Sequence, residues 1–324
     1  MMKIVIADYY YPNLDEEYKV FERLSGKVEI VDLTKIVPGG VKEPDRLIPY
    51  VKDADALIVQ FAKVDKGVID SMERCKVIAR YAIGVDTIDI EAASARGIYV
   101  ANVPDYCIDE VADTAAAHIM NAERRIARAN TLLLRKSFDM EKIRPMRRMK
   151  NQTLCLIGFG NIARDVAAKM KAFFGETVVY DPYFKEHEKY PDIQFLDFDE
   201  AVSRADVISL HVPLNSETKQ MMSDEAFGKM KRGVSIVNTA RGGLIDEAAL
   251  VRALDRGVVG YCGLDVLVTE DFEHSPLLLR DDVFVTPHMG WCSEEAILEL
   301  QKKTAENVAE TLLHGCPRYP VNKV

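Results

Sequence analysis

Short runs of β-branched and other apolar residues alternate with helical patterns along most of this 324-residue chain, which is typical of a parallel α/β protein. In the first hundred residues we predict five strands, with helical segments between them such as Val64–Arg74 and Ile88–Arg96. Helical crossovers between strands indicate a small doubly wound domain. The expected strands are Lys3–Asp8, Val28–Asp32, Ala56–Gln60, Val77–Arg80 and Ile98–Ala101.

A second αβ series follows near residue 150, and in it we predict six parallel strands. Between the two series, one long helix is expected from about Asp109 to Arg135, with Asp109 or Asp105 as its cap. Its Ala-rich centre suits close packing, either against its own domain or against a second subunit. The six expected strands are Thr153–Ile157, Thr177–Tyr180, Asp206–His211, Val234–Thr239, Val258–Leu264 and Val283–Thr286.

The last predicted helix decides the domain organisation. It runs from Ser293, its cap, to His314, and Gly315 and Pro317 stop it. Because it follows the sixth strand of the second series, it is free to return to the first series. We therefore predict discontinuous domains: residues 1–101 with 290–324, and residues 102–289, with two crossovers that create a cleft and a hinge.

The second series opens on a glycine motif, Gly158-Phe159-Gly160-Asn161-Ile162-Ala163, between an apolar run and a helical pattern. Gly158 permits a tight turn, and Gly160 lets backbone N–H groups approach a pyrophosphate at the helix N-terminus. Asp181 ends the next apolar run, 181 − 158 = 23 positions after the first glycine. Its carboxylate can accept from both ribose hydroxyls and would repel a 2′-phosphate. The motif therefore predicts NAD as the cofactor.

The bulk properties exclude several classes of protein. The net charge is −9 and the sequence pI is about 5.3, which argues against a broad nucleic-acid surface, although Arg144 to Lys150 is locally basic. We interpret that stretch as a solvated loop. No apolar run approaches a membrane span or a signal peptide. Six cysteines without a C-x-x-C pair fit a reducing compartment, so we expect a soluble cytoplasmic protein without a metal site.

Candidate catalytic residues follow the expected strands of the second series, where ligands bind in open parallel sheets. Arg241 offers a planar fork of donors for a carboxylate and a carbonyl oxygen. His288 titrates near neutrality and can move a proton, and Glu270 would orient its ring and raise its pKa. Gly242 and Gly243 would leave room for a ligand. Each residue taken singly is compatible with a surface role, and only the joint placement indicates hydride transfer to or from a 2-hydroxy acid.

Six motifs stand in the order of a known family: residues 82–89, Gly158-x-Gly160, residues 180–183, residues 238–242, residues 263–266, and Thr286-Pro287-His288. Over nearly its whole length the chain resembles the D-isomer-specific 2-hydroxyacid dehydrogenases. The resemblance implies a Rossmann NAD-binding domain, a smaller flavodoxin-like substrate domain and a homodimer. It also implies that Arg241 binds substrate, that His288 is the acid/base and that Glu270 is its partner.

The resemblance further implies a set of cofactor contacts, and it places the substrate carboxylate near the backbone amides of Ile83 and Gly84. The chain departs from the family pattern at Ile83, where Ser or Thr is usual, at Ala163, and at Asp271, where Pro is usual. The expected cofactor-binding residues are Ile83, Gly158, Phe159, Gly160, Asn161, Ile162, Asp181, Val212, Pro213, Thr218, Thr239, Ala240, Arg241, Asp265, His288 and Gly290.

Within that family, residues 77–81, 123–125 and 291–294 look most like the C-terminal binding proteins. In that branch the residues matching Arg80 and Trp291 face the substrate, and they would favour a keto acid with an apolar or thioether side chain. The favoured function is an NAD-dependent dehydrogenase that interconverts a 2-keto acid and a D-2-hydroxy acid. The alternatives are an NAD(H)-sensing interaction or corepressor module and 3-phosphoglycerate or hydroxypyruvate chemistry.

Overall fold

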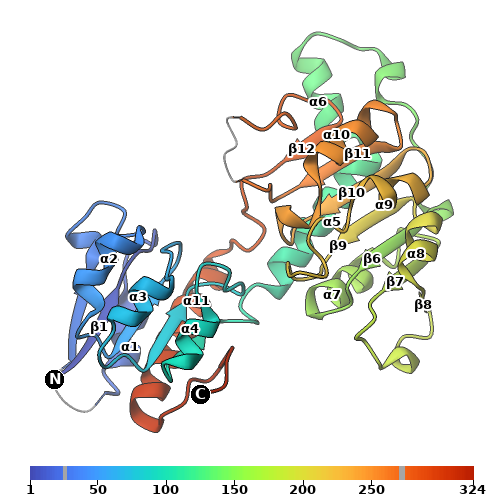
Figure 1. Ribbon diagram of the computed structural model, residues 1–324. Coiled ribbons are helices and arrows are strands. Elements are labelled where there is room, and N and C mark those ends of the chain that lie inside the picture. Colours follow the sequence, from blue (N-terminus) through green and yellow to red (C-terminus); the bar gives the residue numbers. More distant parts are fainter. Residues whose placement is uncertain (25–27, 270–273) are drawn as a thin grey trace. The chain divides into compact units, whose positions relative to one another are not determined.

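The computed structural model describes residues 1–24, 28–269 and 274–324, which divide into two compact units (Figure 1). Unit 1 consists of Met1–Tyr106 with Ser293–Val324, so both ends of the chain build it. Unit 2 is the intervening Cys107–Cys292. Each unit has its own parallel sheet and its own buried core, as the sequence predicts.

The described residues of unit 1 form a sheet of five parallel strands in the order β2-β1-β3-β4-β5. All five predicted strands are present, with ends shifted by no more than two residues. The order reverses beside β1, which is typical of a doubly wound sheet. The strands are β1 (Met2–Ile6), β2 (Val28–Asp32), β3 (Ala56–Val59), β4 (Val77–Arg80) and β5 (Tyr99–Ala101).

Helices cover both faces of this sheet. On one face, side chains of α2, α3 and α4 share a core with alternate strand residues such as Val5, Leu57 and Ile78. On the other face α11 packs on α1 and β4. None of the described helices is both long enough and apolar enough to cross a bilayer. The helices are α1 (Asp15–Phe21), α2 (Pro44–Val51), α3 (Lys66–Ser71), α4 (Ile90–Ala95) and α11 (Glu294–His314).

The ends of α11 follow the predicted signals. Ser293 caps the helix by accepting from the N–H of Ala296 at 2.9 Å, and Gly315 ends it in a left-handed conformation at φ +83°. Behind the helix, the buried Glu17 carboxylate joins three elements. It accepts from the Tyr81 hydroxyl at 2.6 Å and from the Gln301 amide at 3.1 and 3.2 Å. Burial raises the pKa of Glu17.

Unit 2 contains a sheet of seven described strands, all parallel, in the order β12-β11-β10-β9-β6-β7-β8. The prediction of six strands is wrong by one, because Ile193–Phe195 forms a short, partly exposed edge strand without a buried apolar run. The strands are β6 (Thr153–Ile157), β7 (Glu176–Tyr180), β8 (Ile193–Phe195), β9 (Val207–Leu210), β10 (Val234–Asn238), β11 (Val259–Leu264) and β12 (Val283–Val285).

Alternate residues of the unit 2 strands face two different cores. Leu154 and Leu156 of β6 pack towards α5 and α7, whereas Cys155 and Ile157 pack towards α8, α9 and α10. The unit is therefore a three-layer sandwich with helices on both faces of the sheet. Its helices are α5 (Ile108–Arg124), α6 (Ile126–Leu134), α7 (Asn161–Met170), α8 (Phe198–Arg204), α9 (Asp224–Lys229) and α10 (Glu247–Asp255).

The expected single helix from Asp109 to Arg135 is wrong in two respects. Arg125 adopts a left-handed conformation at φ +52° and separates α5 from α6. The break is stabilised because Asn121 accepts from the N–H of Ala127 at 2.8 Å, and because the Arg125 guanidinium lies 5.0 Å from the Tyr261 ring centre. The N-cap is Cys107, without a side-chain cap, since Asp109 pairs with Lys169 instead.

We expect Tyr81→Phe to lower the free energy of unfolding of unit 1 by about 1–3 kcal/mol, because a buried carboxylate loses a hydrogen-bond donor. Urea denaturation followed by circular dichroism measures the change. Tyr50→Phe is the matched control, since the Tyr50 side chain is half-buried and has no hydrogen bond within the described residues. Equal stability of the two variants would contradict the proposed role of the Glu17 network.

Candidate functional site

The strands of the unit 2 sheet end in register at one edge. Ile157 pairs with both Tyr180 and Leu210, Asn238 pairs with Leu264, and Leu264 pairs with Val285. The residues that follow these strand ends therefore lie along the carboxyl edge, where open parallel sheets bind ligands. They are Gly158, Asp181, His211, Thr239, Asp265 and Thr286.

The glycine motif has the geometry that the sequence predicts. Gly158 has φ +92°, and a Cβ there would lie 2.8 Å from both the His211 carbonyl oxygen and the Val212 side chain. Gly160 is the N-cap of α7, and a Cβ there would meet no atom within 4 Å. The fully buried Ala163 lets α7 pack close to the sheet. Unpaired amides at the start of α7 thus remain accessible to an anion.

Arg164 adds a cation at this helix end that the sequence analysis did not select. Its guanidinium donates to the Phe159 carbonyl oxygen at 3.3 Å and also contacts the Asn161 side chain. Its position directly after the glycine motif was a usable signal, because a side chain one turn into the helix can fold back over its N-terminus.

Asp181 organises the loop around the glycine motif. One carboxylate oxygen accepts from the N–H of Phe159 at 2.8 Å, and the other accepts from Tyr183 and Phe184 at 2.9 and 3.0 Å. A carboxylate offers about four acceptor positions, so these three bonds leave capacity for a ligand hydroxyl. Asp181 therefore also orders this loop, a structural role that the sequence did not indicate.

The segment after β9 is a compact turn. The Thr218 hydroxyl donates to the Pro213 carbonyl oxygen at 2.6 Å and accepts from the N–H of Asn215 at 2.9 Å. Before the turn, the His211 ring lies 2.9 Å from the Ser209 hydroxyl, and desolvation lowers the pKa of His211 to about 4. His211 is therefore neutral near pH 7.

The loop after β10 is shaped by the buried Asn238. Its amide donates to the Arg241 carbonyl oxygen at 2.8 Å and accepts from the N–H of Ala240 at 3.0 Å. Between them, the Thr239 hydroxyl is buried and has no hydrogen-bond partner among the described residues. Buried polar atoms are rarely left unpaired, so this hydroxyl marks a position for a ligand atom.

The expectation that Gly242 and Gly243 leave room for a ligand is wrong. A Cβ on Gly242 would lie 2.0 Å from the Leu267 carbonyl carbon, and one on Gly243 would lie 2.8 Å from the Leu214 side chain. Gly242 is required because the backbone of Leu267 packs against it, whereas Gly243 is in contact with the flexible end of the Leu214 side chain.

Asp265 controls the loop that carries His288. Its side chain is 1% exposed, and one oxygen accepts from the Thr286 hydroxyl at 2.5 Å and the N–H of Met289 at 3.0 Å. The other oxygen accepts from the N–H of Gly290 at 2.8 Å. The Asp265 carbonyl oxygen accepts from the N–H of His288 at 2.8 Å. The residue predicted to bind cofactor thus fixes the loop of the predicted acid/base.

His288 itself has a strained backbone. Its φ is +54°, a left-handed conformation that costs a residue with a side chain about 1–2 kcal/mol. The His288 carbonyl oxygen accepts from the Trp291 indole N–H at 3.0 Å, which joins two predicted site residues in one turn. Strain of this kind is concentrated at functional sites, where the surrounding structure maintains it.

His118, which lies within the buried part of α5, lies behind this loop. Its Nε2 is 3.0 Å from the Thr286 hydroxyl, and its Nδ1 is buried without a partner among the described residues. Desolvation lowers the pKa of His118, so the ring is neutral and supports Thr286 from within α5. No sequence signal separates this histidine from an ordinary core residue.

The remaining predicted residues lie in unit 1 or outside the described residues. Arg80 donates to the carbonyl oxygens of Gln60 and Gly84 at 3.1 and 2.9 Å, and it lies 3.9 Å from Asp86. It therefore shapes the turn that contains Ile83 and Gly84. Within the described residues no acceptor is found for the N–H groups of Ile83 and Gly84. Glu270 lies outside the described residues.

The described part of the chain contains no cluster of three or more His, Cys, Asp or Glu side chains that could hold a metal ion. The cysteines are free thiols, and Cys75, Cys107, Cys155 and Cys262 are buried.

Comparisons with known proteins identify the family. Residues 116–290 match the model of the D-isomer specific 2-hydroxyacid dehydrogenase, NAD binding domain. The chain is also 37% identical to the hydroxypyruvate reductase of Thermotoga maritima, over 83% of this chain and 89% of that protein. The chain belongs to the D-isomer specific 2-hydroxyacid dehydrogenase family. Its unit 2 carries the NAD-binding domain of this family.

Two further relatives extend the match. The D-3-phosphoglycerate dehydrogenase of Methanocaldococcus jannaschii is 38% identical over 96% of this chain, which spans 57% of that protein's length. The D-lactate dehydrogenase of Aquifex aeolicus, solved with NAD and lactic acid, has a TM-score of 0.80 and 28% identity, covering 97% of this chain and 96% of that chain. None of these three relatives is named as a C-terminal binding protein.

The residues of the carboxyl edge fit an NAD molecule. The start of α7 offers amides beside an open Gly160, Asp181 retains acceptor capacity, and the Thr239 hydroxyl is buried without a partner. These three features correspond to a pyrophosphate, a ribose hydroxyl and a polar ligand atom. The described residues thus agree with the family's cofactor.

The neutral His211 has a consequence for stability. The pKa of histidine in unfolded chains is about 6.5, and that of His211 is about 4. The contribution of the neutral His211 ring to the free energy of unfolding is therefore fully present above pH 6.5 and is lost as the pH falls towards 4. We expect the free energy of unfolding to fall in this window by at most about 1.4 kcal/mol per pH unit from this residue.

His211→Gln should flatten that slope, because the variant has no proton to take up at this position. Urea midpoints measured from pH 7 to pH 4 test this. His314→Gln is the control, since His314 is exposed on α11 and should leave the slope unchanged. The same slope in both variants would disprove the assignment.

Proposed function

We propose that this protein is an NAD-dependent oxidoreductase that interconverts a 2-keto acid and a D-2-hydroxy acid. The observation that carries the proposal is the loop of His288, which Asp265 holds in a left-handed turn at the same sheet edge as the NAD-binding motif. Arg241 lies at the same edge, in the loop after β10, which pairs with β11, the strand that precedes Asp265. An imidazole, a guanidinium and a dinucleotide-binding loop together support this chemistry.

The residues of the chain would divide the reaction between them. Arg241 binds the carboxylate and the carbonyl oxygen of the keto acid and stabilises the negative charge that develops on that oxygen. His288 donates a proton to the oxygen, and in the reverse direction it accepts the proton from the hydroxyl. NADH supplies the hydride. Asp265 and Trp291 position His288 by fixing its backbone.

We propose that the amides of Ile83 and Gly84 add to substrate binding, with Arg80 as the side chain that fixes their turn. Glu270 as the partner of His288 remains a prediction. The relatives named hydroxypyruvate reductase and D-3-phosphoglycerate dehydrogenase support a small acid as substrate. Trp291, half-buried beside His288, supports a substrate with an apolar side chain.

We also propose a homodimer in the cytoplasm. Large apolar side chains are exposed on α6 and on the segment after it, among them Leu134 at 77% and Phe138 at 81% exposure. Figure 1 shows α6 at the margin of unit 2. A second copy would remove this surface from water. The buried free thiols support a reducing compartment.

We expect Arg241→Gln and His288→Asn each to lower kcat/KM by more than about 100-fold, because the carbonyl oxygen loses a charged donor or its proton source. The affinity for NADH should change by less than about threefold in His288→Asn. Steady-state oxidation of NADH with a panel of 2-oxo acids and fluorescence titration with NADH measure the two quantities. His314→Gln serves as the control variant.

The panel also separates the enzyme from the NAD(H)-sensing alternative. Turnover of at least one 2-oxo acid by the unmodified protein supports the dehydrogenase. Tight NADH binding without oxidation by any acid of the panel would refute it and favour an interaction module.

Trp291→Ala should change the ratio of kcat/KM for a branched or thioether keto acid to that for glyoxylate by about tenfold, as expected when an apolar contact is lost. Trp291→Phe retains an apolar ring but loses the indole N–H that donates to His288. We expect Trp291→Phe to lower kcat by a larger factor than the factor by which it changes the ratio of the two kcat/KM values. An unchanged ratio in Trp291→Ala would show that Trp291 does not contact the substrate side chain.

A further inference from the structure

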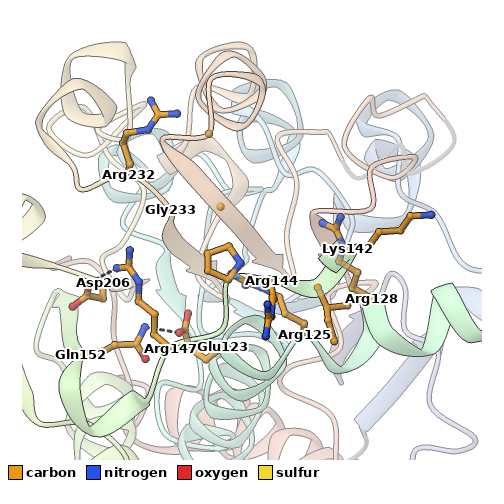
Figure 2. A pocket seen from close by; sticks show the side chains of 14 residues that line it. Glu123, Arg125, Arg128, Lys142, Arg144, Arg147, Gln152, Asp206, Arg232 and Gly233 are labelled. Atoms are coloured by element: carbon orange, nitrogen blue, oxygen red, sulfur yellow. Dashed lines mark hydrogen bonds and ion pairs between the residues drawn. The ribbon is translucent and has the colours of Figure 1, made fainter. Parts of the chain in front are cut away.

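A cavity of about 340 Å³ lies at the amino edge of the unit 2 sheet, opposite the candidate active site (Figure 2). Its lining includes Gly233, just before β10, and Gly260, near the start of β11. β10 contains five residues, so the cavity and the carboxyl edge are about 16 Å apart along the strand. None of the predicted catalytic or cofactor residues lines it.

The cavity is strongly basic, although the chain as a whole has a net charge of −9. Two carboxylates, Glu123 and Asp206, also line it. Figure 2 shows Arg125, Arg128, Lys142 and Arg144 together on one side and Arg147 beside Asp206 on the other. The six basic residues in the lining are Arg125, Arg128, Lys142, Arg144, Arg147 and Arg232.

Both carboxylates are engaged by groups of unit 2. Glu123 accepts from the Gln152 amide at 2.6 Å and from the Ser235 hydroxyl at 2.7 Å. Asp206 accepts from the N–H of Thr153 at 3.0 Å and pairs with Lys231 at 3.2 Å and with Arg147 at 3.5 Å. Asp206 is therefore paired with its own cations, whereas Glu123 is held by neutral donors and its charge still acts on Arg125. Arg128 and Lys142 are left without an ion pair among the described residues.

Several polar atoms of the lining lack partners. The Nε of Arg128 is buried without an acceptor among the described residues, and neither Arg128 nor Lys142 forms an ion pair within them. The Oε1 of Gln152, a residue only 5% exposed, is also buried and unpaired. Burial lowers the pKa of Arg125, since its charge lacks the stabilisation that water provides. A buried donor and a buried acceptor without partners in one lining indicate a ligand.

The floor of the cavity leaves space for a compact ligand. Gly233 has φ +80°, and a Cβ there would meet no atom within 4 Å. The volume lies at the lower end of the range for small-molecule sites and is too small for a helix or a folded segment of a second protein. Guanidinium groups bind phosphate and carboxylate oxygens through paired hydrogen bonds.

We propose that this basic cavity binds a small polyanion whose charge is carried by phosphate or carboxylate groups. Arg128 and Lys142, which form no ion pair among the described residues, provide cations that bind it, and Arg144 adds a guanidinium that pairs with Glu141 at 2.9 Å in the absence of a ligand. Gln152 accepts from a hydroxyl or water at the inner end of the cavity. The site is separate from the cofactor edge, so the ligand binds together with NADH. The basic stretch Arg144 to Lys150, interpreted from sequence as a solvated loop, contributes part of this lining.

Isothermal titration calorimetry of the full chain tests the proposal, with and without saturating NADH and at constant ionic strength, with pyrophosphate in one arm and citrate in the other. We expect one binding event per chain for at least one probe, and the arm that binds identifies the anion type. Arg128→Gln and the surface double variant Lys142→Gln/Arg144→Gln should each raise Kd by at least tenfold. Arg124→Gln, an adjacent exposed arginine outside the lining, should stay within twofold.

Three results would overturn the proposal. The first is that neither probe binds the unmodified chain. The second is that Arg124→Gln weakens binding as much as the cavity variants do, which would indicate only general charge attraction. The third is that NADH displaces the probe. Arg128 lies on α6 and Lys142 on the segment after it, the same elements that we propose for the homodimer. Sedimentation of the same variants therefore tests whether a second copy covers the cavity. If Arg128→Gln dissociates an oligomer that binds neither probe, the cavity belongs to that interface and the proposal is overturned. The measurement does not depend on dehydrogenase activity, so it stands apart from the proposed function.

Discussion

The buried carboxylate of Asp265 is the interaction on which the candidate active site depends. Removing a charge from water is costly, and here the cost is offset by the amides of Met289 and Gly290 and by the Thr286 hydroxyl. Each of these donors belongs to the loop that carries His288. The loop therefore cannot relax without leaving a buried charge unpaired, and this explains how His288 is held at a positive φ.

The same constraint extends into the core and along the sheet edge. Thr286 contacts His118 of α5, and the N–H of Asp265 donates to the carbonyl oxygen of Asn238, which orders the Arg241 loop through its side chain. The two loops expected to act on substrate are thus joined through buried hydrogen bonds. Preorganisation of this kind is what electrostatic stabilisation of a transition state requires.

Sequence patterns predicted the parts of the molecule that local rules determine. The Gly158 turn, the Ser293 cap and the alternating strands follow from backbone conformation and side-chain period, so they were predictable. The break at Arg125 was not, because it depends on a ring of Tyr261, 136 positions later, and on an amide of Asn121. The edge strand Ile193–Phe195 was missed for a related reason, since it takes its order from pairing with β7 rather than from burial.

The net charge of the whole chain is a poor guide to the charge of a single cavity, because it sums over distances beyond the range of electrostatic interactions. Charges on a protein surface are screened within about 8–10 Å in physiological salt. A chain of net charge −9 can therefore hold a cavity in which six basic side chains outnumber two acids. Asp206 pairs with Lys231 and Arg147, whereas Glu123 is held by neutral donors and keeps its charge beside Arg125. Each edge of the sheet thus has its own electrostatic character: the carboxyl edge attracts an anion through helix amides, and the amino edge through arginine side chains.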